Sequence, residues 1–193
     1  MDWKIRILFS LILIFLTGCF PPKKTSELGK KTVFDDPRFF YDKEDYTLIR
    51  VNPETREEDI NLYMSWKSEK FLSDSQEIQS FNDPNTPPPV RKFVKPYYPK
   101  EAKERGYQPT IILLLKVDST GIVELARLVD YIVKGAVVER KLEIVEESLV
   151  ESSLEAAIQF EFIPQYFEFP ISYNEEGKIE PVFISFPIRF VLH

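Results

Sequence analysis

The sequence has very little of the two residues that dominate metal and thiol chemistry. Its 193 residues include one cysteine, Cys19, and one histidine, His193. A disulfide within the chain needs two cysteines, and a Cys/His zinc site needs several ligands. Both are therefore excluded.

Motifs of common enzymes are absent as well. There is no Gly-x-Ser-x-Gly, and the six glycines form no phosphate-binding loop. Glu146 and Glu147 are candidates for acid–base work, but adjacent residues on a helix point in different directions. We therefore predict a protein that is not an enzyme, with no catalytic residue, no metal and no cofactor.

Positive charge is also in short supply. The chain has 25 Lys and Arg against 31 Asp and Glu, a net charge of −6. Nucleic-acid binding depends on a basic surface that releases counterions, so we expect no nucleic-acid partner. An apolar content of 44% allows one ordinary domain with an appendage.

An export signal is the first feature that the sequence does contain. Lys4 and Arg6 precede an apolar run over residues 7–16, which is shorter than the ~20 residues of a membrane-spanning helix. The run ends in Leu16-Thr17-Gly18-Cys19, which resembles the bacterial lipobox. That resemblance implies a signal peptide over 1–18 and acylation of Cys19. The alternative is an uncleaved N-terminal anchor with an incidental cysteine.

The next segments are predicted to connect the anchor to a folded domain. Residues 19–32 are rich in lysine and poor in large apolar side chains, as in a flexible tether. Residues 33–89 are interpreted as a partly ordered linker region that ends in a proline cluster. Within it, Thr47 to Val51 resembles a strand, and a capping box at Thr55 and Glu58 predicts one helix. We expect the apolar stripe of this helix (Ile60, Tyr63, Met64 and Phe71) to pack on the following domain, with an independent partner site as the alternative, and Lys67 to face water.

Residues 90–193 are predicted to form a small α+β domain. The pattern gives a short helix after Tyr98-Pro99, a central strand over 111–117, and a second strand from Ile122 to Val129. A capping box at Ser148 and Glu151 begins a second helix, and strict alternation over 182–192 gives the last strand. We expect an antiparallel sheet of three main strands with two helices on one face.

Five pieces of this region, in order, resemble the C-terminal domain of TonB-family proteins, and the resemblance spans about residues 88–192. They are Tyr98-Pro99-Lys100-Glu101-Ala102; Thr110 to Val117 with Asp118-Ser119-Thr120-Gly121; Leu154-Glu155-Ala156; Phe160-Glu161-Phe162-Ile163-Pro164; and Pro181-Val182 with Pro187-Ile188-Arg189-Phe190. The family implies a periplasmic domain that receives an extended peptide of an outer-membrane transporter by strand addition at its final strand.

The resemblance and the pattern together define a candidate partner-binding site on the last strand. An edge strand offers unpaired backbone groups, and Pro187 fits an edge because proline cannot donate to a ladder. Core packing is the alternative role for the alternating apolar side chains, with the backbone and the opposite face, including Arg189, left for binding. The partner-binding residues expected are Val182, Phe183, Ile184, Ser185, Phe186, Ile188, Arg189 and Phe190.

Function and location follow as expectations. We expect a lipid-anchored protein of the cell envelope of a Gram-negative-type bacterium that faces the periplasm. Phe20 after the acylated cysteine favours the outer membrane over the inner one. Its partner would be a TonB-dependent transporter or another envelope protein, in a role accessory to transport. The alternative is an envelope scaffold that forms a homodimer through the same edge.

Overall fold

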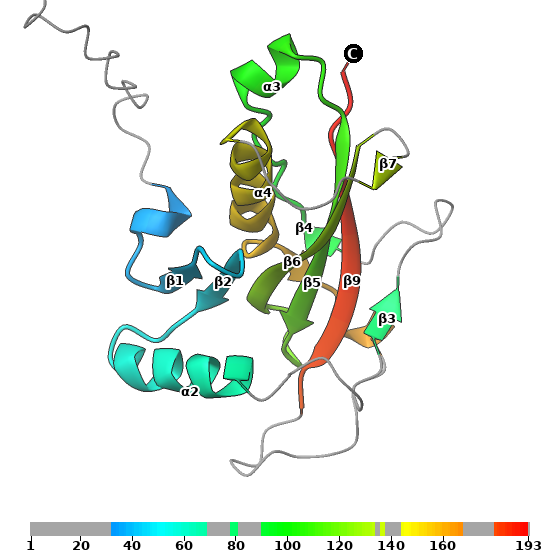
Figure 1. The fold of residues 1–193 in the computed structure, drawn as a ribbon. Coiled ribbons are helices and arrows are strands. Elements are labelled where there is room, and N and C mark those ends of the chain that lie inside the picture. The colour runs from blue at the N-terminus through cyan, green and yellow to red at the C-terminus, as the bar shows by residue number, and fades with distance from the viewer. Residues whose placement is uncertain are drawn as a thin grey trace, which may run out of the picture. The chain divides into compact units, whose positions relative to one another are not determined.

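An antiparallel sheet forms the centre of the molecule (Figure 1). The computed structural model describes residues 32–68, 78–80, 90–133, 136–137, 144–167 and 180–192, all within one unit, Thr32–His193. The strand order among them is β1-β2-β6-β5-β9-β3, with β7 paired to β6 and a separate pair of β4 and β8. The strands are β1 (Phe39–Asp42), β2 (Thr47–Arg50), β3 (Ile78–Ser80), β4 (Val90–Lys92), β5 (Pro109–Val117), β6 (Val123–Val133), β7 (Ala136–Val137), β8 (Glu161–Phe162) and β9 (Val182–Arg189).

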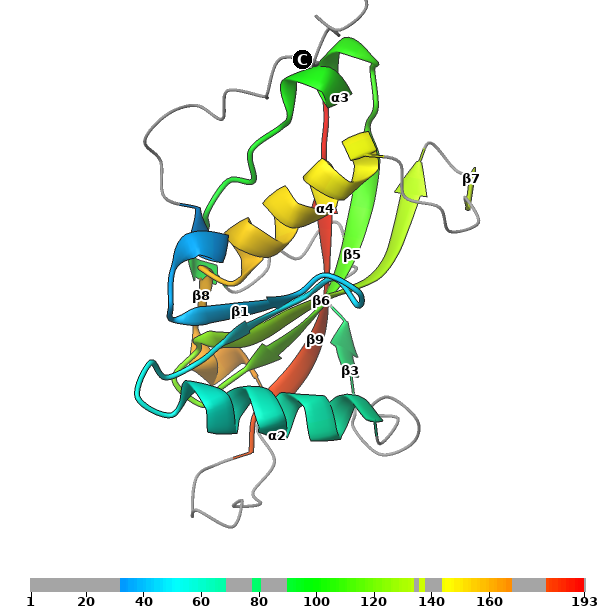
Figure 2. The same ribbon diagram turned by 60° about the vertical axis from the view of Figure 1, so that its left-hand side comes forward.

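The helices lie on both faces of this sheet. They are α2 (Arg56–Ser68), α3 (Lys100–Glu104) and α4 (Ile144–Ala157), with short 3-10 turns η1 (Val33–Asp35) and η2 (Pro164–Tyr166). In Figure 2, α4 and α2 lie on opposite sides of the β1–β2 hairpin. The class is therefore α+β, as predicted, but the sheet is larger than the three strands expected: five antiparallel strands, with β3 added in parallel.

Alternation along the strands divides the apolar side chains between two cores. In β5, Ile111, Leu113, Leu115 and Val117 belong to the larger core, which α4 and Ala102 of α3 cover. Ile49 of β2, Leu125 of β6 and Tyr63 of α2 form the smaller core on the other face. Successive strand residues point to opposite faces of the sheet. β2 therefore contributes Leu48 to the larger core and Ile49 to the smaller one.

The domain begins earlier in the chain than the sequence suggested. Thr47, Leu48 and Ile49 pair with Arg127, Ala126 and Leu125 of β6, and Leu48 is completely buried. Residues 39–50 are thus part of the same sheet as the C-terminal strands. The boundary expected near residue 89, with 33–89 as a linker region, is therefore wrong for β1 and β2.

Three glutamates of α4 form hydrogen bonds or an ion pair with residues 33–43 near the start of the domain. Glu155 accepts a hydrogen bond from the backbone N–H of Val33 at 3.0 Å, and Glu147 pairs with Lys43 at 2.7 Å. Glu151 lies between them, where Tyr41 donates to it at 3.5 Å. Desolvation and the charge of Glu147 raise the pKa of Glu151 above its usual value.

An ion-pair network joins α2 to the β1–β2 hairpin. Lys67 contacts Asp42 at 2.7 Å and Asp45 at 3.2 Å, and the Tyr63 hydroxyl donates to Asp42 at 3.0 Å. The expectation that Lys67 faces water is wrong, because it completes this network. Tyr63 and Ile60 pack against the sheet as expected, Met64 is 48% exposed, and Phe71 lies outside the described residues.

Removal of the Asp42 carboxylate is expected to cost about 2–3 kcal/mol of unfolding free energy at pH 7, because three hydrogen bonds to this charged group are lost, from Lys67, Tyr63 and the backbone N–H of Glu44. Burial alone would raise the pKa of Asp42, but the bonds from Lys67 and Tyr63 outweigh it and lower that pKa. A depressed carboxyl pKa contributes stability that is present above the unfolded pKa near 4 and lost as the pH falls through the folded value. Urea unfolding of Asp42→Ala should therefore approach the wild type below about pH 4.

Glu44→Ala provides the matched control for this network. Glu44 lies 4.0 Å from Lys67, and its side chain is 92% exposed. An exposed pair of this kind contributes at most about 0.5 kcal/mol. Equal losses in the two variants would contradict the role assigned to Asp42.

The opposite edge of the sheet is β1, and its backbone groups are partly bonded within the chain. Val51 donates to the carbonyl of Arg38, so Phe39, the next residue along, directs its backbone groups away from β2. Its N–H donates to the Asp36 carbonyl at 3.0 Å, and its carbonyl accepts from Arg56 at 3.0 Å. This end of β1 therefore has neither group of Phe39 free.

Candidate partner-binding edge

The last strand, β9, lies between β5 and β3 in the sheet. Its alternate side chains face the core, as the sequence pattern predicts. β9 pairs with β5 along its whole length, from Val117↔Val182 to Thr110↔Arg189. The core-facing side chains are at most 5% exposed: Val182, Ile184, Phe186, Ile188 and Phe190. These side chains pack in the core, so they are not available to a partner.

The backbone groups of β9 alternate between β5 and the outer side. Phe190 donates to the carbonyl of Pro109 at 3.0 Å, which makes 190 and 109 a hydrogen-bonded pair. In an antiparallel ladder every second pair is of this kind. The residues that direct their N–H and C=O away from β5 are therefore Phe183, Ser185, Pro187 and Arg189.

Part of the outer side is already occupied. β3 pairs in parallel with β9, from Ile78↔Phe183 to Ser80↔Ser185, and Figure 1 shows its short arrow beside the N-terminal half of β9. The expectation of an open edge along the whole last strand is thus wrong for Phe183 to Ser185. Beyond Ser185, no described residue pairs with β9 on this side.

The remaining half of the edge is short of donors. Pro187 has no N–H, and its position on the outer side explains why the β5 ladder tolerates it. The outward groups left are the carbonyl of Pro187 and the N–H and carbonyl of Arg189. An edge of this length offers three backbone hydrogen bonds.

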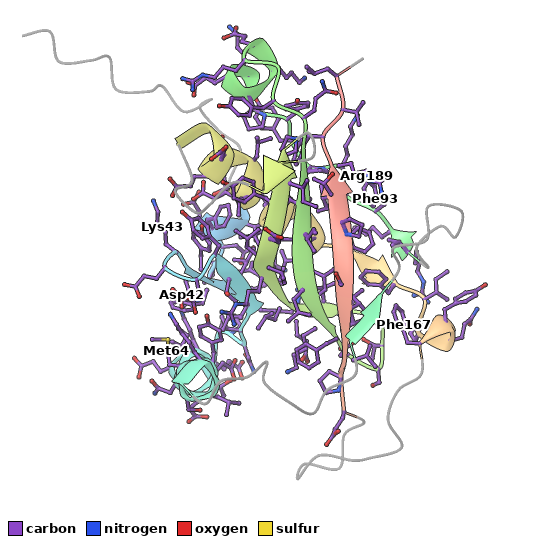
Figure 3. The ribbon with its side chains drawn as sticks, turned by 45° about the vertical axis from the view of Figure 1, so that its right-hand side comes forward. Asp42, Lys43, Met64, Phe93, Phe167 and Arg189 are labelled. Atoms are coloured by element: carbon purple, nitrogen blue, oxygen red, sulfur yellow. The ribbon has the colours of Figure 1, made fainter. Side chains whose placement is uncertain are left out.

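Two exposed side chains flank this half of the strand. Arg189 is exposed, and Phe93, which follows β4, is 56% exposed. Figure 3 shows both beside the C-terminal end of β9. Phe93 stacks on Phe160 with ring centroids 4.9 Å apart, and Phe160 contacts Phe186 of β9 at 5.4 Å. The sequence pattern did not indicate Phe93, because it stands alone in a non-periodic segment.

The other expected site residues differ in their accessibility. Phe183 is 3% exposed, although its side chain is on the face opposite the larger core. Ser185 is half-buried. Arg189 alone of the expected residues presents an exposed side chain, and the lipidation site Cys19 lies outside the described residues.

No other arrangement in the described part of the chain indicates a chemical site. Over those residues, no three Cys, His, Asp or Glu side chains are grouped so that they could hold a metal ion. No helix there is long and apolar enough to cross a bilayer. Glu147 is engaged by Lys43, and Glu146 is buried.

Comparison of the chain with protein-family models, with curated proteins and with solved structures found no match. The fold and the edge of β9 are therefore the basis for a functional interpretation.

Proposed function

We propose that this protein is a lipid-anchored module of the cell envelope that binds an extended peptide of a transport partner by strand addition to β9, in the manner of the TonB-family C-terminal domain it resembles. The observation that carries the proposal is β3. This segment is about 100 residues distant from β9 in the chain, and it adds to β9 through main-chain pairing. The outer side of β9 is thus able to accept an extended strand.

The number of available hydrogen bonds favours a partner strand that replaces β3 over one that pairs only with the part of β9 beyond β3. At ~0.5–1.5 kcal/mol per net bond, the three outward groups of Pro187 and Arg189 supply roughly 1.5–4.5 kcal/mol before any ordering cost. That range corresponds to millimolar binding or weaker. If β3 leaves, the groups of Phe183 and Ser185 become available too, and seven bonds supply roughly 3.5–10 kcal/mol. We infer that a partner strand takes the place of β3.

Gln79→Pro is the substitution that tests this exchange. Gln79 is opposite Ile184, between Phe183 and Ser185, so its N–H and carbonyl are the groups that a parallel ladder directs at β9. Proline removes that donor and weakens β3. The ligand is a synthetic peptide with the sequence of residues 76–82, Gln-Glu-Ile-Gln-Ser-Phe-Asn, titrated by calorimetry. We expect Gln79→Pro to bind it at least about 10-fold more tightly than the wild type, because no intramolecular competitor remains.

Gln79→Thr is the matched control, since threonine retains the backbone donor and a high strand propensity. It should behave as the wild type does. Equal affinity of all three proteins for the peptide would contradict strand exchange. A stable dimer in sedimentation that is indifferent to the peptide would favour the envelope scaffold instead.

A further inference from the structure

One end of the molecule combines exposed lysines with exposed apolar side chains. Residues 91–105 contain six Lys and Arg but only two Glu, in a chain whose net charge is −6. Lys95, Lys100 and Lys103 are all exposed. Tyr97 among them is 63% exposed, and Val191 and Leu192 near the C-terminus are 52% and 36% exposed. We refer to these six residues as the α3 end.

Contacts between the two segments hold α3 and the C-terminal residues at the same end of the domain. The Tyr98 ring packs edge-on against Phe190 at 5.1 Å, and the backbone N–H of Leu192 lies 3.5 Å from the side-chain oxygen of Gln108. Figures 1 and 2 both show α3 and the C-terminal segment at this end. Lys103 also lies over the Tyr98 ring, with Nζ 5.4 Å from its centroid.

Negative charge is concentrated on α4, which packs beside α3, and at the start of α2 (Figure 2). α4 carries Glu146, Glu147, Glu151 and Glu155, and α2 begins with Glu57, Glu58 and Asp59. An anionic surface would thus attract the α3 end and repel these helices. The two acidic residues of α3 reduce this attraction, but Glu104 lies 3.6 Å from Lys100, and both side chains remain largely exposed.

The corrected start of the domain limits its distance from the anchor. The first described residue is Thr32, and only 12 residues lie between it and Cys19, a stretch that spans at most about 45 Å when fully extended. With the proposed lipid on Cys19, a domain on so short a tether would meet the membrane surface continually. Tyrosine and aliphatic side chains next to lysines are the residues that favour the headgroup region.

We propose that the α3 end is a membrane-contacting face that binds anionic phospholipid headgroups. This inference rests on the proposed lipid anchor at Cys19 and is separate from the peptide site on β9. The lysines supply the attraction to the headgroups. Tyr97, Val191 and Leu192 insert among the headgroups and fix the orientation of the domain on the membrane.

Vesicle co-sedimentation tests the proposal without the lipid anchor. The protein used is the chain from Thr32 onward, which contains the whole described sheet and both cores. We expect at least about 10-fold stronger binding to vesicles with 30% phosphatidylglycerol in phosphatidylcholine than to pure phosphatidylcholine, and loss of that difference at 0.5 M salt. Equal binding to the two vesicles would overturn the proposal.

Two triple variants separate charge from fold. Changing Lys95, Lys100 and Lys103 to glutamate should weaken binding to the anionic vesicles by about 100-fold or more, because each lysine near such a surface contributes roughly five-fold. The same three changes to arginine should leave binding within about two-fold. Unchanged binding of the glutamate variant would overturn the proposal. Binding of poly-glutamate without binding of anionic vesicles would also overturn it and indicate an acidic protein partner.

Titration with the 76–82 peptide tests the membrane face and the strand exchange at β9 independently of each other. The lysine-to-glutamate variant should bind the 76–82 peptide as the protein with native lysines does. Loss of vesicle binding with retained peptide binding supports a separate membrane face. Loss of both in the variant would overturn the separation of the two sites.

Discussion

Gly121→Ala is expected to lower the free energy of unfolding by about 2–4 kcal/mol. Gly121 has a φ of +91°, which L side chains rarely adopt, and a Cβ there would lie 2.3 Å from the carbonyl oxygen of Phe162 and 3.3 Å from Cδ of Pro164. The left-handed conformation costs roughly 1–2 kcal/mol, and displacement of packed backbone adds a similar amount. Urea unfolding followed by circular dichroism measures the loss.

The position of Gly121 explains why its neighbours leave no room. Asp118 accepts hydrogen bonds from the N–H groups of Thr120 and Ile122 at 2.9 and 2.8 Å and so shapes the β5–β6 turn. The carbonyl of Gly121 then accepts the N–H of Phe162 at 2.8 Å. This bond joins the turn to β8, and a methyl group at Gly121 would force the two apart.

Gly106→Ala is the control for this prediction. Gly106 also has a positive φ, +70°, but nothing lies within 4 Å of the position of its Cβ. Only the conformational cost of roughly 1–2 kcal/mol applies there. A loss in Gly106→Ala as large as that in Gly121→Ala would show that close approach to Phe162 contributes nothing.

Phe160→Ala is expected to cost about 3–5 kcal/mol, the range for a large aromatic removed from a packed core. Phe160 is completely buried. Its ring contacts Phe93 at 4.9 Å, Phe186 at 5.4 Å and Phe162 at 6.3 Å, so it joins three segments. The loss should appear in both chemical and thermal unfolding.

Phe93→Ala tests the other side of the same stacked pair. Since Phe93 is 56% exposed, its removal should cost only about 0.5–1.5 kcal/mol. The same variant should weaken peptide binding at β9 if Phe93 flanks the bound strand. A Phe160→Ala loss no larger than that of Phe93→Ala would contradict the central place of Phe160 in the core.

The strands that the sequence predicted well are the long ones with a clear pattern. Ile111 to Val117 forms the central strand β5, and the alternation over 182–192 forms β9 with its apolar side chains in the core. The helix predicted from Ser148 begins at Ile144. A long strand or helix shows a clear hydrophobic periodicity in the sequence, so these elements could be predicted without knowledge of their neighbours.

Short strands that depend on distant partners could not be predicted in the same way. β1 has four residues and β3 has three, too few to show a period. The residues of β2 predict an extended segment, but its partner β6 lies more than 70 residues later in the chain. Nothing local in Thr47 to Arg50 indicates that pairing, so the sequence alone predicts a domain boundary that is too late.

The candidate site could be predicted only in part, because β3 is another short strand whose partner is distant in the chain. Pro187 predicts an edge or a distortion of the last strand, and in the structure it directs its backbone nitrogen away from β5, where a proline does not break the pairing. The occupation of Phe183 to Ser185 by β3 depends on a segment without a pattern of its own. The sequence therefore directs attention to the last strand, but the pairing of β3 with its first half could not be predicted from the sequence.

The Arg56 contact with β1 has a consequence for self-assembly. A sheet with two receptive rims can stack copy upon copy into a filament, whereas a sheet with one such rim can join a single neighbour there. Arg56 and the Asp36 carbonyl satisfy both outward groups of Phe39, so growth from that rim is hindered. Growth of a filament by main-chain pairing should therefore be hindered at the Phe39 end of β1.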